Sequence, residues 1–137
     1  MFLCTGNSCR SQMAEGFARE LGKGLIEPHS AGLTPCYVHP LAIEVMKEAD
    51  IDISHQQSKA VDDLLLRKMD LIVTLCGHAD KYCPTVPPGI KKIHMPVHDP
   101  VGTIGSEEEI LNAFRRARDE IRRNIHGIIE DIKFQNR

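Results

Sequence analysis

The chain has 137 residues, which favours a single domain over residues 1–137 with a core of useful size. Its 17 basic and 19 acidic residues give a formal charge of −2, so we expect neither nucleic acid nor a membrane surface as the partner, because both attract a basic excess. Hydrophobic residues make up 42% of the chain, without a low-complexity tract, a leader or an apolar run near the roughly 18 residues of a spanning helix, which excludes disordered tails, secreted disulfide scaffolds and membrane proteins.

Hydrophobic spacing predicts strands and helices in alternation through the first half of the chain. The opening residues 1–3 are a short apolar run, typical of the end of a strand. Apolar residues then recur at helical spacing over 13–21, and Gly22 ends this predicted helix. Pro40 stands at the first position of a second predicted helix, and a shorter helix is predicted over 61–69.

The second half continues this alternation. Residues 71–75 form a continuous, partly β-branched apolar run, which is typical of a parallel strand buried on both faces. A proline-rich loop separates it from a candidate strand over 92–97. Ser106 and Glu109 form a capping box ahead of a long helix whose apolar residues step by three or four. The pattern predicts an α/β fold with a small open parallel sheet of about four strands and helices on both faces.

Three side chains that can act as nucleophiles or acids follow the candidate strands. Cys4 and Cys76 come directly after the first two strands, and Asp99 lies two residues past the third. In an open parallel sheet the ligand crevice lies at the carboxyl ends of the strands. We therefore expect these three side chains to converge on one edge of the sheet.

The segment between the first strand and the first helix has the composition of an anion-binding loop: Cys4-Thr5-Gly6-Asn7-Ser8-Cys9-Arg10-Ser11. Successive backbone N–H groups form a concave nest there, and the helix N-terminus adds about half a positive charge. Gly6 permits the tight path and Asn7 tolerates a left-handed conformation. Arg10 can hold two oxygens of a tetrahedral oxyanion, and the positive field favours the thiolate of Cys4. We expect Cys9 to pack inside, and the alternative for the whole loop is a buried cysteine beside a surface arginine.

The chain has five cysteines, an odd number that points to the reducing cytoplasm, where cysteines tend to be catalytic, redox-active or metal-bound. Cys76 and Cys83 lie seven positions apart, and on a continuous helix they would be ~10 Å apart along the axis, too far for a disulfide. A disulfide therefore requires this segment to unwind, with Gly77 supplying flexibility. We assign Cys36 no partner and expect a structural role.

Two alternatives stay open for Cys76 and Cys83. They could be unrelated core thiols. They could also belong to a zinc site, although the six residues between them exceed the usual ligand spacing. A zinc site would add the nearby histidines His78, His94 and His98.

Residues 2–16 resemble the opening of the thioredoxin-coupled arsenate reductases, a family built on the low-molecular-weight protein tyrosine phosphatase fold. The similarity continues over nearly the whole chain, in segments 29–32, 51–54, 73–76, 83–84, 87–88 and 99–100. Phosphatase relatives generally lack the pair corresponding to Cys76 and Cys83. They also usually carry tyrosines after the Asp-Pro, where this chain has Val101 and Gly102. Both differences favour the reductase.

The resemblance implies reduction of arsenate to arsenite, for arsenic detoxification, by three thiols in turn. Cys4 would form a covalent adduct with an arsenate or phosphate oxyanion held by the amides of the loop and by Arg10, with Asp99 as general acid. Cys76 would then release arsenite, and Cys83 would close a Cys76–Cys83 disulfide for thioredoxin to reduce. The resemblance implies no cofactor and no metal, a monomer in the cytoplasm, and a weak phosphatase side activity.

Many members of the family bind a monovalent cation beneath the loop, with residues matching Asn7, Glu15 and Ser30 plus an aspartate. Lys59 stands at the position of that aspartate. The resemblance therefore implies that its ammonium group replaces the ion and that activity is insensitive to potassium. The alternative is a solvated surface lysine.

Two other functions remain open from the residues alone. One is a low-molecular-weight protein tyrosine phosphatase that uses only Cys4, Arg10 and Asp99. The other is a zinc- or arsenite-binding sensor built on Cys76, Cys83 and the histidines. For Asp99, the alternative to an acid is a turn-forming residue before proline.

Overall fold

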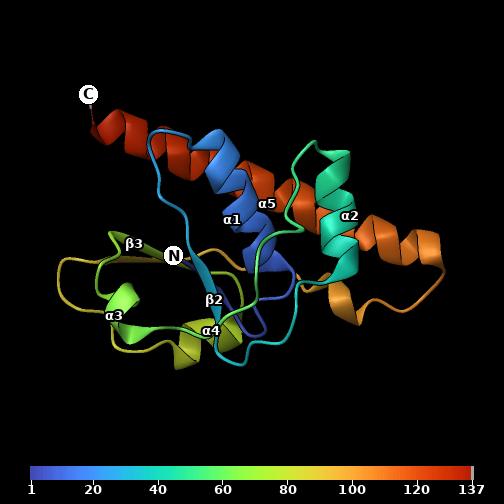
Figure 1. Ribbon diagram of the computed structural model, residues 1–137, viewed down its shortest axis with the longest axis horizontal. Helices are drawn as coiled ribbons and strands as arrows, with labels where there is room; N and C mark the ends of the chain where they lie inside the picture. The colour runs from blue at the N-terminus through green and yellow to red at the C-terminus, as the bar shows by residue number, and fades with distance from the viewer. Residues whose placement is uncertain (137) are drawn as a thin grey trace.

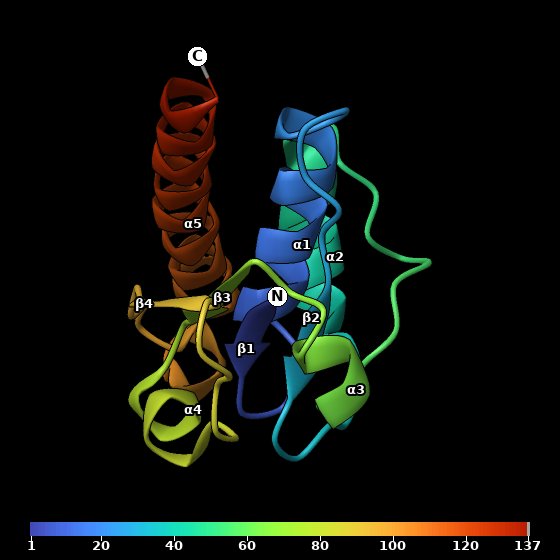
Figure 2. The same cartoon turned by 90° about the vertical axis from the view of Figure 1, so that its left-hand side faces the viewer.

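The computed structural model describes residues 1–136 of the chain. Its centre is a four-stranded sheet in which all neighbouring strands are parallel, in the order β2-β1-β3-β4. Figure 1 shows the whole chain, and Figure 2 labels all four strands. The strands are β1 (Phe2–Cys4), β2 (Ser30–Gly32), β3 (Leu71–Thr74) and β4 (Lys91–His94). The predicted parallel sheet is confirmed, and β2 lay outside the predicted strands because its sequence, Ser-Ala-Gly, has no apolar run.

Helices cover both faces of the sheet, as predicted. They are α1 (Arg10–Leu21), α2 (Pro40–Glu48), α3 (Asp63–Leu66), α4 (Gly77–Tyr82) and α5 (Glu107–Gln135), with a 3₁₀ turn η1 (Pro100–Gly102). Helices α1, α2 and α5 lie together on one face, and α3 and α4 lie on the other (Figure 2). Within residues 1–136, no helix combines the length and the apolar character needed to cross a membrane.

Helix α1 gives the anion loop a rigid support. Its Met13, Ala14 and Phe17 are completely buried between β1 and α5. Gly16 lets the segment after α2 approach closely, because a Cβ there would lie 2.7 Å from the side chain of Ile53. The loop at the N-terminus of α1 therefore starts from a fixed base.

Two predicted boundaries are wrong. Helix α3 is shorter than the predicted 61–69, because the Asp62 side chain accepts hydrogen bonds from the first turn and starts the helix at residue 63. Strand β4 ends at His94 rather than at residue 97, because the hydrogen bonds to β3 change register beyond it. Met95 N–H still donates to Thr74 O at 2.9 Å, but Val97 N–H then donates to the very next residue, at Leu75 O, at 3.0 Å.

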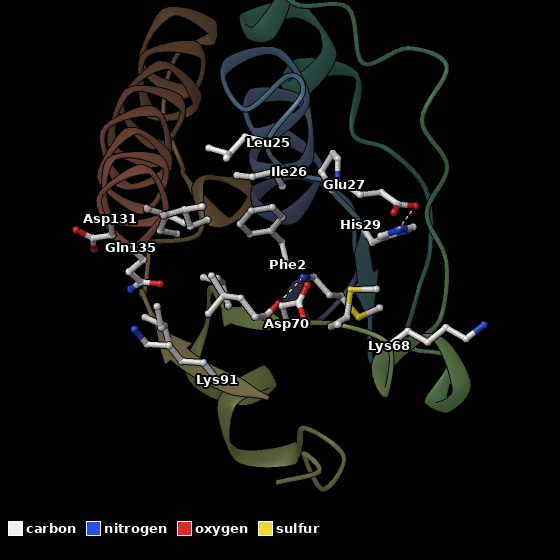
Figure 3. A pocket seen from close by; sticks show the side chains of 18 of the residues that line it. Phe2, Leu25, Ile26, Glu27, His29, Lys68, Asp70, Lys91, Asp131 and Gln135 are labelled. Carbon is white, nitrogen blue, oxygen red and sulfur yellow. Dashed lines mark hydrogen bonds and ion pairs between the residues drawn. The ribbon is translucent and has the colours of Figure 1, made fainter. Parts of the chain in front are cut away.

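A cavity of about 510 Å³ lies at the amino ends of the strands, where Phe2, Leu71 and Lys91 line it (Figure 3). The carboxyl ends, which Cys4 and Thr74 mark, form the opposite edge of the sheet. The cavity is therefore separate from the edge at which the sequence places its candidate site.

Candidate active site

The loop of residues 4–11 joins β1 to α1, and four successive carbonyls accept hydrogen bonds from outside it. The donors are Thr34 N–H to Thr5 O (2.8 Å), Cys36 N–H to Gly6 O (3.2 Å), Gln12 Nε2 to Asn7 O (2.9 Å) and His39 N–H to Ser8 O (2.9 Å). No peptide bond in residues 1–136 is cis, and in a trans peptide the next N–H points opposite to the carbonyl. The N–H groups of residues 6–9 therefore face the interior of the loop, and none donates to another described residue. This is the geometry of an anion-binding nest.

Asn7 fixes the curvature of this loop. Its φ of 47° is left-handed, as expected, and its side chain is completely buried. The Oδ1 atom accepts a hydrogen bond from Lys59 N–H at 3.0 Å, and Nδ2 donates to Ser11 Oγ at 2.7 Å and to Ser30 Oγ at 3.0 Å. These contacts hold an otherwise costly backbone conformation in place.

Cys4 lies at the base of the loop with a hydrogen-bonding partner for its sulfur. Its Sγ is 2.9 Å from Ser11 Oγ, and its side chain is buried. Because Ser11 Oγ already accepts a hydrogen bond from Asn7, its own hydrogen is free to point at the sulfur. The loop therefore gives the sulfur of Cys4 a hydroxyl group within hydrogen-bonding distance.

Arg10 and Asp99 meet at the mouth of the loop. Arg10 begins α1, donates to Val97 O at 2.9 Å, and approaches Asp99 Oδ2 with its other terminal nitrogen at 3.5 Å. Asp99 caps the turn η1 through Val101 N–H at 3.0 Å and is half exposed. Asp99 lies five residues past the end of β4 rather than two, yet the extended chain between them still brings it to the carboxyl edge.

Cys76 lies against the same loop. Its Sγ is 3.4 Å from the hydroxyl oxygen of Thr5, which directly follows Cys4 in the chain. The Cys76 side chain also caps α4, accepting a hydrogen bond from Ala79 N–H at 3.3 Å. The expected convergence of the strand ends therefore holds for Cys4, Cys76 and Asp99.

Cys83 lies at the opposite end of α4 from Cys76 and is half-buried. Burial raises the pKa of the Cys83 thiol; the charge of Lys92 acts in the opposite direction, and that of Asp80 raises it further. No disulfide joins any two of the five cysteines, all of which lie within the described residues. Because α4 separates the two thiols by ~10 Å along its axis, a disulfide between them requires α4 to unwind.

The other two cysteines differ from each other. Cys9 is buried in the core, as expected, and burial together with the charges of Asp99 and Cys4 raises the pKa of its thiol. Cys36 is exposed, but its backbone N–H is one of the donors that support Gly6 O. Its Sγ also donates to Gly6 O at 3.6 Å, so the backbone and the side chain of Cys36 both contact the anion loop.

Lys59 reaches the polar cluster beneath the loop, while 42% of its side chain stays exposed. Its Nζ lies 2.9 Å from Gln57 O, 3.5 Å from Ser30 Oγ and 3.5 Å from Glu15 Oε1. The Ser30 hydroxyl donates to the same Glu15 oxygen at 2.9 Å. Asn7, Glu15, Ser30 and Lys59 are thus brought together as the sequence analysis expected.

Gln12 is a supporting residue that the sequence analysis missed. It is completely buried, and its Nε2 donates to Asn7 O at 2.9 Å and to Gln57 O at 3.0 Å. Its Oε1 accepts from Gln56 Nε2 at 2.8 Å. The sequence does contain a signal for this role, because Gln12 directly precedes the apolar stripe that starts at Met13. A glutamine buried beside that stripe needs specific hydrogen-bonding partners.

No group of three or more His, Cys, Asp or Glu side chains in residues 1–136 is placed so that it could hold a metal ion. The histidines of the zinc alternative are spread over α4, β4 and the following loop. Of these, His94 contacts Thr74 Oγ1 at 2.8 Å.

The model of the low molecular weight phosphotyrosine protein phosphatase family matches residues 1–137. Arsenate reductase 2 of Staphylococcus saprophyticus is 51% identical over 124 residues, which cover 90% of each chain. Among solved structures, an arsenate reductase in the phosphate-binding state superimposes with a TM-score of 0.80 at 37% identity, over 96% of both chains. A thioredoxin-dependent arsenate reductase of Corynebacterium glutamicum superimposes with a TM-score of 0.79 at 25% identity, over 98% of this chain and 61% of that one.

Proposed function

The chain belongs to the low molecular weight phosphotyrosine protein phosphatase family and is an arsenate reductase, and we propose that it works by a relay of three cysteines that thioredoxin resets. The observation that carries this proposal is the contact between Thr5 of the anion loop and Cys76 Sγ at 3.4 Å. It puts a second thiol beside the loop that holds Cys4, with Cys83 at the far end of the same short helix. A phosphatase needs only the loop and the acid Asp99, whereas a reductase needs further thiols to supply two electrons.

Arsenate binds in the loop as a tetrahedral oxyanion. The inward N–H groups of residues 6–9 and the guanidinium of Arg10 provide the positive field, and the N-terminus of α1 adds to it. The relative described in a phosphate-binding state supports this assignment, because phosphate and arsenate have the same shape and charge.

The first covalent step uses Cys4. Its thiolate attacks arsenic, a sulfur–arsenic bond forms, and one oxygen leaves as water after taking a proton from Asp99. Cys76 then attacks the Cys4 sulfur. A Cys4–Cys76 disulfide forms, the electron pair of the sulfur–arsenic bond stays on arsenic, and As(V) departs as As(III) in arsenite.

The last steps restore the loop. Cys83 attacks Cys76, the Cys76–Cys83 disulfide forms, and Cys4 leaves as a thiolate ready for another arsenate. The new disulfide lies in a segment with exposed neighbours, where a dithiol such as thioredoxin can attack it. Since this cycle needs reduced thiols, we place the enzyme in the cytoplasm. We also expect it to be a monomer.

Lys59 takes part in this proposal as the replacement for a cation. Its ammonium group lies within 3.5 Å of Glu15 Oε1 and of Ser30 Oγ, and Ser30 Oγ in turn accepts a hydrogen bond from Asn7. A positive charge fixed there stabilises the buried carboxylate of Glu15 without a bound ion. The loop then keeps its shape at any potassium concentration.

The test is arsenate-dependent NADPH consumption with thioredoxin and thioredoxin reductase, measured beside hydrolysis of an aryl phosphate. Cys4→Ser should abolish both activities, because no nucleophile remains. Cys83→Ser should release about one arsenite per enzyme and stop with the Cys4–Cys76 disulfide formed. Sustained turnover of Cys83→Ser with thioredoxin would contradict this order of thiols. Brisk hydrolysis without arsenate-dependent NADPH loss would instead favour a phosphatase, the second candidate that the anion loop supports.

A further inference from the structure

We propose that Asp80 and Lys92 are positioning residues that keep the Cys76–Cys83 segment helical until the last thiol exchange. This inference rests on the proposed relay, in which that segment has to unwind. The residues that hold the segment are Thr74, Asp80, Lys92 and His94, and together we name them the α4 anchor.

The α4 anchor joins the middle of α4 to the edge of the sheet. Asp80 Oδ1 lies 3.1 Å from Lys92 Nζ and accepts a hydrogen bond from the hydroxyl of Thr74 at 3.2 Å. Lys92 Nζ also donates to the backbone carbonyl of Asp80 at 3.1 Å. Thr74 Oγ1 is in turn 2.8 Å from His94 Nδ1. A single residue of α4 is therefore held through its side chain and its backbone at once.

Other contacts of α4 are few. Of its six residues only Ala79 is buried, and Tyr82 is 56% exposed. A helix of this length is unstable on its own, so its contacts with the rest of the protein decide whether it forms. One of those contacts is the hydrogen bond that Ala79 N–H donates to Cys76 Sγ, and we expect it to weaken when the sulfur moves to bond with Cys4. The α4 anchor then becomes the main polar contact that keeps the segment helical.

The last exchange has to break this contact. Cys83 attacks the Cys76 sulfur, a Cys76–Cys83 bond forms, and the Cys4–Cys76 bond breaks with its electron pair leaving on Cys4, so that no net oxidation occurs. The two Cα atoms must come within about 7 Å, although the helix separates them by ~10 Å. Asp80 lies midway between the two cysteines and moves away from Lys92 when the segment folds back. Removing the anchor beforehand therefore makes the disulfide easier to form.

Lys92 has a second effect, on the attacking thiol. Burial raises the pKa of Cys83, the ammonium charge of Lys92 acts to lower it, and the carboxylate of Asp80 acts to raise it. Once Asp80 has moved away, Lys92 has lost its ion-pair partner and still favours the thiolate of Cys83. Substituting Asp80 and substituting Lys92 should therefore change the rate of exchange differently.

The test compares Asp80→Asn and Lys92→Met with Lys91→Met as the matched control. Lys91 is the neighbouring residue on β4, lines the cavity at the other edge, and makes no ion pair within residues 1–136. The Cys76–Cys83 disulfide is titrated in dithiothreitol redox buffers and read by mass spectrometry after alkylation. Both anchor variants should favour the disulfide by about threefold to tenfold, or ~15 to ~30 mV in reduction potential, and Lys91→Met should match the wild type.

Single-turnover decay of the Cys4–Cys76 intermediate gives the second measurement. It should be about threefold faster in Asp80→Asn, and Lys92→Met should lose this gain because the charge beside Cys83 is gone. Hydrolysis of an aryl phosphate, which uses only the anion loop and Asp99, should be unchanged in all three variants and reports that they are folded. Equal potentials for Asp80→Asn and wild type would overturn the anchor, whereas absence of the Cys76–Cys83 disulfide in the wild type would overturn the relay itself.

Discussion

The anion loop and α4 each carry a reactive cysteine at the carboxyl edge of the sheet, but they are held in opposite ways. The loop is fixed by Asn7 and Gln12, which are completely buried and hydrogen-bonded. Helix α4 is fixed by Asp80 and Lys92, whose side chains are 39% and 33% exposed. Buried polar networks specify one geometry, while exposed ion pairs are weak. The oxyanion needs every loop N–H in one place, and the thiol relay needs a segment that moves.

Arg10→Lys changes the anion loop, the more rigidly held of the two regions, and should have the largest effect. Arg10 offers a planar fork to the oxyanion and is oriented by Val97 O and Asp99, and a lysine keeps the charge but loses the fork. We expect kcat/KM for arsenate to fall by about 10²- to 10³-fold. NADPH-coupled kinetics measure it, and the dissociation constant for phosphate shows how much of the loss is binding. A loss below about fivefold would mean that the loop amides hold the oxyanion without the fork.

Hydrogen exchange measures directly how much more stable α1 is than α4 against local opening. Met13 N–H, which donates to Cys9 O at 2.9 Å in α1, should be about 10²-fold more protected than Asp80 N–H, which donates to Cys76 O at 3.0 Å in α4. Both amides close the first turn of their helix, so they are matched in position. In the oxidised protein the protection of Asp80 should disappear and that of Met13 should stay. Similar protection of the two amides in the reduced protein would remove the distinction between the regions.

The sequence was most informative where the signal is local. Apolar runs placed Cys4 and Cys76 at the ends of two strands, and Ser106 with Glu109 marked the start of α5. Composition of the loop predicted the left-handed Asn7. Each of these depends on residues only a few positions apart, which a single sequence displays.

Several features that depend on distant contacts were not predicted. Strand β2 is stabilised by pairing with β1, and its Gly32 is needed because a Cβ there would lie 2.7 Å from Thr5 O. Gln12 acquires its role from Gln57, which is 45 positions away. The contacts of α4 with Lys92 likewise join two separate elements. No periodic pattern in the sequence predicts the support of the loop or the anchoring of α4.

Gln12→Leu tests whether the buried support fixes the loop. The substitution leaves Asn7 O and Gln57 O without their donor, which should lower the free energy of unfolding by about 2 kcal/mol. Phosphate affinity should fall about tenfold, because the peptide that aims Ser8 N–H into the loop is no longer held. Urea denaturation and phosphate titration measure the two effects, with Glu20→Gln on the exposed side of α1 as control. Wild-type phosphate affinity in a destabilised Gln12→Leu would show that the loop holds its shape without this contact.

Substituting Lys59 should give the smallest effect, and it tests the support beneath the anion loop. Its Nζ occupies the position between Glu15 Oε1 and Ser30 Oγ, so the wild-type rate should be the same in potassium and in sodium buffers. Lys59→Asp removes this charge and adds a carboxylate to an oxygen-rich cluster, which a monovalent cation can then neutralise. We expect this variant to be slower in sodium and to gain about twofold to fivefold from potassium, because cation binding stabilises the folded loop. Steady-state rates at constant ionic strength measure it, with Lys47→Asp on the exposed face of α2 as the control for added negative charge. A potassium response of the wild type as large as that of the variant would mean that the ammonium group does not take the place of the ion, and that the loop is supported by Asn7, Glu15 and Ser30 with a bound cation instead.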